Sequence, residues 1–179
     1  MKNKFILFSV CGLLAILAVI FLTLPARKGG SADYRDRKIM APPFLLAALN
    51  GDKIKLADFH GQVIILDFWA TWCPPCQEGI PHLNQLYKEF NGNGLVVIGI
   101  SLDRGAPEDV RRFVNEKRVE YINVMGTEEV FQAYSSLPGL GPIQGIPTAF
   151  VIDRQGQICR KFVGLTKKET FVEAIKTIL

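Results

Sequence analysis

The chain has 179 residues with a formal net charge of +4, and its positive charge is concentrated in residues 1–38. The remainder is close to neutral, which excludes a nucleic-acid-binding domain, since that class needs a basic face on the folded part. The length suits one domain with a substantial core and an N-terminal extension.

The N-terminal extension begins with an apolar run, residues 5–24, that contains no charged side chain. It is long enough to cross a bilayer as a helix, and we interpret residues 1–28 as a transmembrane signal-anchor. A cleaved signal peptide is the alternative, but its apolar core is shorter and residues 24–26 form a weak cleavage site. The polar, small-residue segment 29–38 is expected to be a linker.

A folded domain is predicted over residues 39–179. Apolar residues flank Asn50-Gly51 on both sides, and this pattern is typical of a β-hairpin. Residues 63–69 are too apolar for a half-exposed strand and fit a central one. Asp67 interrupts that strand, and a buried carboxylate is costly unless it has a partner or a task.

Helices and strands are expected to alternate along the rest of the domain. The expected elements are a helix over 74–90 with Pro81 inside it and Asn91-Gly92 at its end, a strand over 95–100, a helix over 107–118, a strand over 121–124, a helix over 127–134, a Gly/Pro-rich loop over 137–145, strands over 148–152 and 157–163, and a helix over 167–178. This order predicts an α/β fold with a central mixed sheet, an antiparallel edge and helices on both faces.

The segment Trp72-Cys73-Pro74-Pro75-Cys76 joins the predicted central strand to the first long helix. A Cys-x-x-Cys motif there indicates redox chemistry, because the free N–H groups and the positive end of the helix dipole favour a thiolate. Cys73 is expected to be exposed at the helix N-terminus and Cys76 to be shielded one turn later. A disulfide between them closes too short a ring to be a good structural staple, so it is better suited to opening and closing.

Metal binding is the alternative use of this motif, but a zinc site needs further ligands. The other candidate ligands are His60, His82, Cys11 and Cys159. A metal-binding module or metallochaperone using Cys73, Cys76 and His82 therefore remains an alternative, while the favoured reading includes neither a metal nor an organic cofactor. We interpret His82 and Glu78 as surface residues of the helix, and Cys159 as a packing residue of the last strand.

Several segments together resemble the thioredoxin superfamily. They are Asp67-Phe68-Trp69-Ala70, Trp72 to Cys76, Pro81, Gly145-Ile146-Pro147-Thr148 and Phe162-Val163-Gly164. Residues 41–44, the added helix and strand between 107 and 124, and the anchor narrow the resemblance to the TlpA/ResA-like branch of membrane-anchored thiol–disulfide oxidoreductases. The resemblance implies a thioredoxin fold with an N-terminal β-hairpin and an inserted helix–strand unit.

The resemblance also implies roles for single residues. Cys73 would attack a substrate disulfide and Cys76 would resolve the mixed disulfide. Pro147 would be a cis-proline facing the two sulfurs. The substrate-peptide groove would be completed by Trp72, Ile146 and Gly164.

Asp67 matches the buried acid of ordinary thioredoxins, whereas many TlpA/ResA-like proteins are expected to have a neutral residue there. Burial disfavours the charged carboxylate, so we expect a raised pKa for Asp67. Such a group can accept the proton that Cys76 must lose before it attacks. The alternative is an acid held by backbone N–H groups for structural reasons.

The resemblance implies a reductase of protein disulfides, with apocytochrome c as one substrate during cytochrome c maturation. The catalytic domain would lie on the periplasmic side of the cytoplasmic membrane and take electrons from a membrane donor. A peroxiredoxin-like peroxidase is an alternative, because the hairpin start resembles that group too. The residues before Cys73 lack its Pro-x-x-x-Thr/Ser-x-x-Cys signature.

Overall fold

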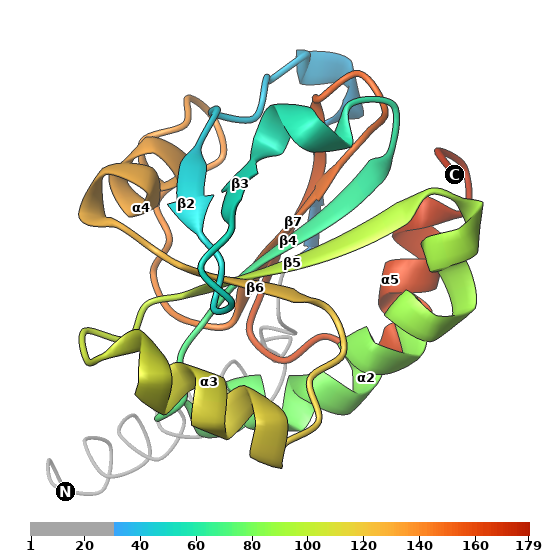
Figure 1. The fold of residues 1–179 in the computed structure, drawn as a ribbon. Helices are drawn as coiled ribbons and strands as arrows, with labels where there is room; N and C mark the ends of the chain where they lie inside the picture. Colours follow the sequence, from blue (N-terminus) through green and yellow to red (C-terminus); the bar gives the residue numbers. More distant parts are fainter. Residues whose placement is uncertain (1–30) are drawn as a thin grey trace, which may run out of the picture.

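The computed structural model describes residues 31–179. At its centre is a six-stranded sheet with the order β1-β8-β7-β4-β5-β6 (Figure 1). The strands are β1 (Ser31–Asp33), β4 (Val63–Trp69), β5 (Leu95–Ser101), β6 (Ile122–Met125), β7 (Thr148–Ile152) and β8 (Ile158–Val163). Strands β4, β5 and β6 run parallel, while β7, β8 and β1 extend the sheet in antiparallel pairs. The predicted mixed sheet with an antiparallel edge is therefore confirmed.

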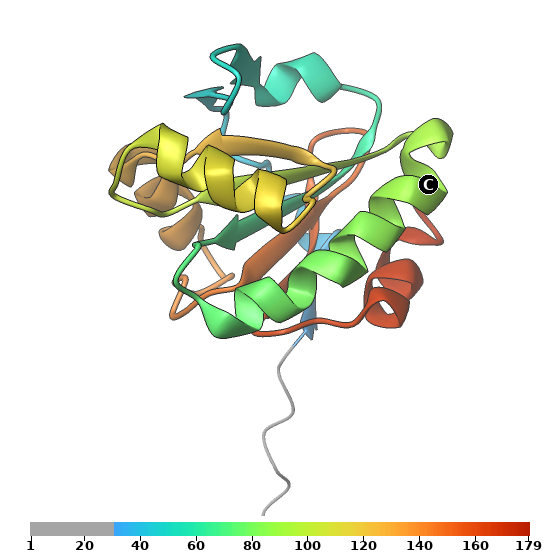
Figure 2. The same ribbon diagram turned by 60° about the horizontal axis from the view of Figure 1, so that its bottom comes forward.

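Helices cover both faces of this sheet, as predicted (Figures 1 and 2). The helices are α2 (Pro74–Phe90), α3 (Pro107–Glu116), α4 (Glu128–Ser135) and α5 (Lys168–Ile175), and the 3-10 turns are η1 (Arg35–Arg37), η2 (Leu56–Phe59) and η3 (Asn91–Asn93). Helices α2, α3 and α5 lie on one face of the sheet. Helix α4 lies on the other face with the predicted hairpin of β2 (Leu45–Ala47) and β3 (Lys53–Lys55).

Strand β4 supplies both hydrophobic cores, because alternate residues of a strand point to opposite faces. Val63 and Ile65 pack with the residues of α2 and α5. Leu66 and Phe68 pack with the residues of α4 and the hairpin. All seven residues of β4 are buried, so the strand is a rigid base for the segment that follows it.

The expected helix ends are within a few residues of the observed ones, with one difference at the end of α2. The helix stops at Phe90 and a 3-10 turn over Asn91–Asn93 follows. The left-handed residue that completes this turn is Gly94, at φ 89°, and not Gly92. Glycine adopts this conformation without a Cβ clash, so the chain leaves the helical conformation two residues later than Gly92, at Gly94.

Residues 29–38, expected to be a linker, contain regular structure from Ser31 onward. Ser31–Asp33 form β1, which pairs antiparallel with β8, and Arg35–Arg37 form η1. Backbone pairing at a sheet edge needs no apolar periodicity, which is the primary sequence signal for a strand. The predicted signal-anchor, residues 1–28, lies outside the described residues. Within residues 31–179, no helix is both long and apolar enough to cross a membrane.

Lys161 of β8 holds the Gly/Pro-rich loop that precedes Ile146. Its Nζ donates hydrogen bonds to the carbonyl oxygens of Leu140 (3.2 Å), Gly141 (2.8 Å) and Pro142 (2.8 Å). The side chain is buried, and burial lowers the pKa of its ammonium group. Three carbonyl acceptors match the three donors of an ammonium group, so this contact fixes the loop despite the desolvation.

We expect Lys161→Met to destabilise the protein, because it keeps the apolar stem but leaves three carbonyl groups without their donor. The free energy of unfolding in urea should fall by about 2–4 kcal/mol. Lys167→Met is the matched control, since Lys167 is exposed and a surface change is usually worth less than about 0.5 kcal/mol. Equal losses in the two variants would contradict the role given to Lys161.

Candidate active site

The two cysteines of the motif lie where β4 passes into α2. Cys73 is the N-cap residue of α2 and forms a disulfide with Cys76, so the predicted pairing is present. The backbone N–H of Cys76 donates a hydrogen bond to the Sγ of Cys73, at 3.2 Å. Prolines occupy the first helical positions, where a missing N–H costs no helical hydrogen bond.

The expectation that Cys73 is exposed is wrong for this disulfide form. Only 3% of Cys73 is exposed, and Cys76 is similarly buried at 4%. The reason is the segment before β7: the Sγ of Cys73 lies 3.6 Å from the carbonyl oxygen of Ile146. By contrast, the neighbouring Trp72 is 66% exposed.

The segment opposite the sulfurs is built from two backbone features. The Ile146–Pro147 peptide bond is cis, as the resemblance implied. The backbone N–H of Gly164 donates to the carbonyl oxygen of Pro147, at 2.8 Å, and Gly164 has φ +85°, a conformation that favours glycine. Pro147 and Gly164 line a small cavity together with Cys76. The structure thus places Ile146, Pro147 and Gly164 next to the two cysteines, whereas Trp72 lines a separate cleft.

Asp67 lies on the α2 face of β4 and is only 5% exposed. Burial raises the pKa of its carboxyl group to about 8, in the expected direction. Asp67 and Cys76 both line the small cavity, whose volume is about 20 Å³, enough space for one water molecule. Within residues 31–179, no group donates a hydrogen bond to this carboxyl, so the alternative of an acid held by backbone N–H groups finds no support.

The AhpC/TSA family model matches residues 38–161, more than half of the chain. The chain belongs to the AhpC/TSA family. Thiol-disulfide oxidoreductase ResA of Bacillus thuringiensis (strain Al Hakam) is 32% identical over 181 residues, covering 99% of each chain. ResA of Bacillus subtilis (strain 168) is 29% identical over 170 residues, covering 92% of this chain and 88% of that one.

Solved structures support the same assignment. A thioredoxin-family thiol:disulfide interchange protein from Chlorobium tepidum TLS matches with a TM-score of 0.71 and 31% identity, covering 79% of this chain and 97% of that one. This member of the AhpC/TSA family is therefore a ResA-like thiol–disulfide oxidoreductase with a thioredoxin-like fold, as the resemblance implied.

The sequence reasoning missed Asp103, which fastens the turn before Cys73. Its carboxylate accepts hydrogen bonds from the backbone N–H of Thr71 (3.0 Å), the hydroxyl of Thr71 (2.5 Å) and the hydroxyl of Ser101 (2.8 Å). Gln77 of α2 donates to the carbonyl oxygen of Thr71, at 2.7 Å. The position of Asp103 just after β5 could have identified it. In parallel sheets, functional sites form at the carboxyl ends of the strands.

The remaining candidate residues lie away from the disulfide or take no part in a cluster. Glu78 is exposed on α2, as expected, and His82 is half-buried. Cys159 is buried, and burial raises the pKa of its thiol to about 11, which fits a packing role. Among residues 31–179, no group of three or more His, Cys, Asp or Glu side chains could hold a metal ion.

The raised pKa of Asp67 predicts a pH-dependent stability. Between about pH 4, where the unfolded carboxyl ionises, and about pH 8, where the folded one does, the folded protein holds a proton that the unfolded chain releases. The free energy of unfolding should therefore fall as the pH rises through this range and level off above it. We expect Asp67→Asn to remove this decline in urea unfolding of the disulfide form.

Asp109→Asn is the control for this measurement, because Asp109 is exposed and pairs with Arg112 at the surface. It should leave the slope of stability against pH as in the wild type. The same slope in Asp67→Asn as in the wild type would show that Asp67 is already ionised in the folded protein at low pH.

Proposed function

We propose that this protein reduces disulfide bonds of exported protein substrates with the Cys73/Cys76 dithiol. The thiolate of Cys73 attacks one sulfur of the substrate disulfide, which releases the other substrate sulfur as a thiolate. The thiolate of Cys76 then attacks the Sγ of Cys73, which releases the second substrate thiolate and forms the Cys73–Cys76 disulfide. The observation that carries the proposal is this disulfide at a helix N-terminus, opposite the cis Ile146–Pro147 bond.

Asp67 is proposed to take the proton that Cys76 loses before the second step. Both residues line one cavity with space for a water molecule, so the proton can pass directly or through that water. With a pKa of about 8, the carboxyl is ionised in roughly one molecule in ten at pH 7, and this ionised form is the one that accepts the proton. The carboxyl exchanges protons near neutral pH, the range in which a general base is effective.

The substrate peptide is proposed to bind around Trp72, Ile146, Pro147 and Gly164. Trp72 offers an exposed aromatic surface, and aromatic side chains are frequent anchors of peptide and protein partners. A cleft of about 620 Å³ opens beside Trp72, with Asp103 and Phe131 among its lining residues. It provides room for substrate residues next to the reacting cysteine.

The proposed location is the periplasmic side of the cytoplasmic membrane, with residues 1–28 as the anchor. A secreted thiol-disulfide isomerase from Corynebacterium glutamicum has the same fold, with a TM-score of 0.72 and 25% identity, and the ResA relatives span nearly the full chain. The proposed partners are apocytochrome c, whose haem-binding cysteines would be reduced, and a membrane electron donor that restores the dithiol. Neither a cofactor nor nucleic acid is part of this proposal.

A peroxiredoxin-like peroxidase is the second candidate, because the AhpC/TSA family model covers residues 38–161. The residues before Cys73 lack the proline and the Ser or Thr of the peroxidase signature. Consumption of hydrogen peroxide by the reduced protein at the rate of its disulfide reduction would favour this candidate.

Trapping of the mixed disulfide tests the proposed reaction. We expect reduced Cys76→Ala protein to form a stable mixed disulfide with an oxidised Cys-x-x-Cys-His peptide, because the resolving thiol is missing. Mass spectrometry should locate the bond at Cys73. The matched variant Cys73→Ala should trap little peptide, and equal trapping by both variants would contradict the order of attack.

Kinetics of the second step test the role of Asp67. With Asp67→Asn, formation of the mixed disulfide should keep the wild-type rate, while its resolution at pH 7 should slow by roughly a hundredfold, the lower range for loss of a general base. The deficit should shrink at high pH, where Cys76 ionises without help. Stopped-flow measurements of both steps across pH decide this, with Asp109→Asn as the control. A wild-type resolution rate at pH 7 would rule out the proton-acceptor role.

A further inference from the structure

The cavity that Asp67 and Cys76 line comes close to the solvent at one place. Most of its wall is buried, including the ring of Phe171. The rest of the wall is formed by Gly79 of α2 and by residues 164–166, which connect β8 to α5, and these residues are at least partly exposed. The gap between α2 and this connection is therefore where the cavity meets the solvent.

Leu165 covers this gap with an apolar side chain. A Cβ atom added to Gly79 would lie 3.6 Å from the Cδ1 of Leu165, so the leucine packs directly over the glycine. Leu165 is also 43% exposed, which means that one side of its side chain faces the cavity and the other faces the solvent. The leucine therefore lies between the space beside Asp67 and bulk water.

Hydrogen bonds fix the backbone on both sides of Leu165. The N–H of Gly164 donates to the carbonyl oxygen of Pro147, at 2.8 Å. The hydroxyl of Thr166 donates to the carbonyl oxygen of Gly164, at 3.2 Å. Exposed side chains change rotamer within picoseconds to nanoseconds, so the leucine can open and close the gap while the backbone around it stays in place.

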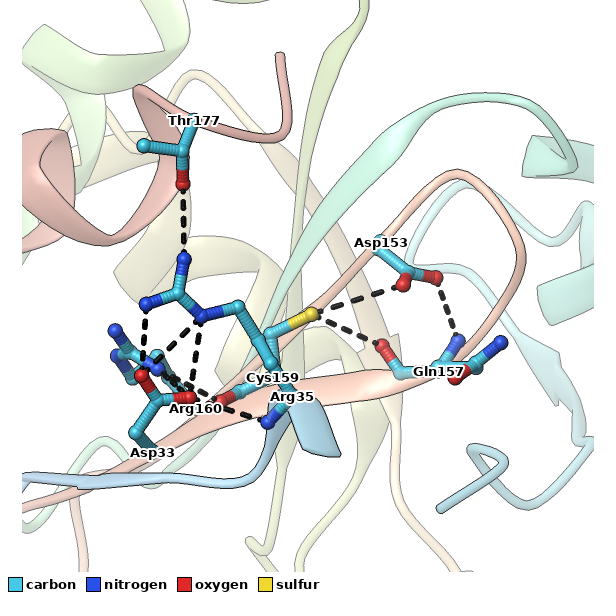
Figure 3. Close-up of polar contacts among 7 residues, drawn as sticks. All are labelled: Asp33, Arg35, Asp153, Gln157, Cys159, Arg160 and Thr177. Atoms are coloured by element: carbon cyan, nitrogen blue, oxygen red, sulfur yellow. Dashed lines mark hydrogen bonds and ion pairs between the residues drawn. The ribbon is translucent and has the colours of Figure 1, made fainter. Parts of the chain in front are cut away.

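A second thiol–carboxyl pair lies far from the disulfide and is held differently (Figure 3). The Sγ of Cys159 lies 3.7 Å from a carboxylate oxygen of Asp153. That carboxylate accepts hydrogen bonds from the backbone N–H groups of Gln155 (2.9 Å) and Gln157 (2.8 Å), and such donors stabilise the ionised form. Asp67 has no such donor within residues 31–179, so the stability of its charge depends on the water that reaches it.

We propose that protons pass between Asp67 and the solvent through the gap between Gly79 and Leu165, and that the Leu165 side chain sets how much water reaches the carboxyl. This inference rests on the proposed role of Asp67 as proton acceptor. Transfer of the proton from the Cys76 thiol leaves a thiolate and a carboxylic acid. The acid then gives the proton to water in the gap, which restores the carboxylate. Leu165 acts through Asp67, so it is a positioning residue and not a catalytic one.

Two other groups near Asp67 can lose a proton. Cys76 faces the cavity from α2, and Tyr121 precedes β6, where burial and then the charge of Asp67 raise the pKa of the tyrosine well above its usual value. The neighbouring strands place Gly99 and Ala149 opposite Asp67, and no other charged side chain of residues 31–179 lines the cavity. In the disulfide form Cys76 has no proton to lose and Tyr121 keeps its own, so the titration of Asp67 can be followed alone.

Carboxyl ¹³C NMR of the disulfide form tests the cover, with Asp67→Asn used to assign the resonance. We expect Leu165→Ala to admit water and to lower the pKa of Asp67 from about 8 by at least about one pH unit, a fraction of the roughly 3–5 units that full burial can cause. Adding Gly79→Ala to Leu165→Ala puts a methyl group back into the gap. This second change should reverse part of the shift.

Two matched variants are the controls. Leu45→Ala truncates another exposed leucine, on the hairpin, and Gly92→Ala adds a methyl group where no atom lies within 4 Å. Neither should move the titration of Asp67. A wild-type pKa in Leu165→Ala, or an equal shift in Leu45→Ala, would overturn the proposal. A shift that Gly79→Ala does not reverse at all would overturn the proposed route.

These measurements need neither substrate nor reductase activity, so the cover can be judged apart from the proposed function. In the stopped-flow assay, the pH at which resolution of the mixed disulfide reaches half its maximal rate should also fall in Leu165→Ala. A purely structural role of Leu165 would leave this pH where it is in the wild type. The expected NMR shift together with a wild-type resolution rate in Asp67→Asn would support the cover and contradict the role of Asp67 as proton acceptor.

Discussion

The burial of β4 is the constraint on which the site depends. Both edges of this strand are occupied, by β5 in parallel and by β7 in antiparallel pairing, so its backbone groups are satisfied and both faces can be covered. A strand held in this way cannot slip, because a shift by one residue would exchange the contents of the two cores. Trp69, the last residue of β4, therefore has a fixed position and packs with Cys73 and Cys76. The same burial places a carboxyl group, Asp67, in the interior, where its ionised form is desolvated.

Two carboxyl groups lie near the disulfide, and their surroundings separate their roles. Asp103 accepts three hydrogen bonds, two from Thr71 and one from Ser101, so its charge is matched by donors and it positions the turn before Cys73. Asp67 has no hydrogen-bond donor among the described residues and adjoins a cavity of about 20 Å³. A carboxyl without donors costs stability near neutral pH, and this cost fits the proposed role of Asp67 in proton exchange.

Local signals in the sequence predicted much of this structure. The prolines after Cys73 predicted the start of α2, and Asn50-Gly51 predicted the β2–β3 hairpin. Features that depend on distant segments were not predicted. Cys73 is buried because Ile146, far away in the chain, lies against its sulfur. Lys161 gives no sign in the sequence that it is buried, because its partners are backbone carbonyl groups. Strand β1 is short and polar and has no apolar periodicity, so its pairing with β8 cannot be predicted from the sequence.

The edges of the main sheet are short or covered, whereas the backbone of Ile146 at the active site is unpaired. On one side, β1 pairs with β8 and is itself the outer strand, only three residues long. On the other side, the hairpin covers β6, where Ala48 pairs with Val124. Covered edges resist pairing with other chains. At the active-site end, by contrast, Ile146 forms no backbone hydrogen bond within residues 31–179, and its carbonyl oxygen lies next to the sulfur of Cys73. An extended substrate segment that pairs with Ile146 would gain main-chain hydrogen bonds there. Its cysteine would be held beside Cys73, which fits the proposed binding of substrate around Ile146.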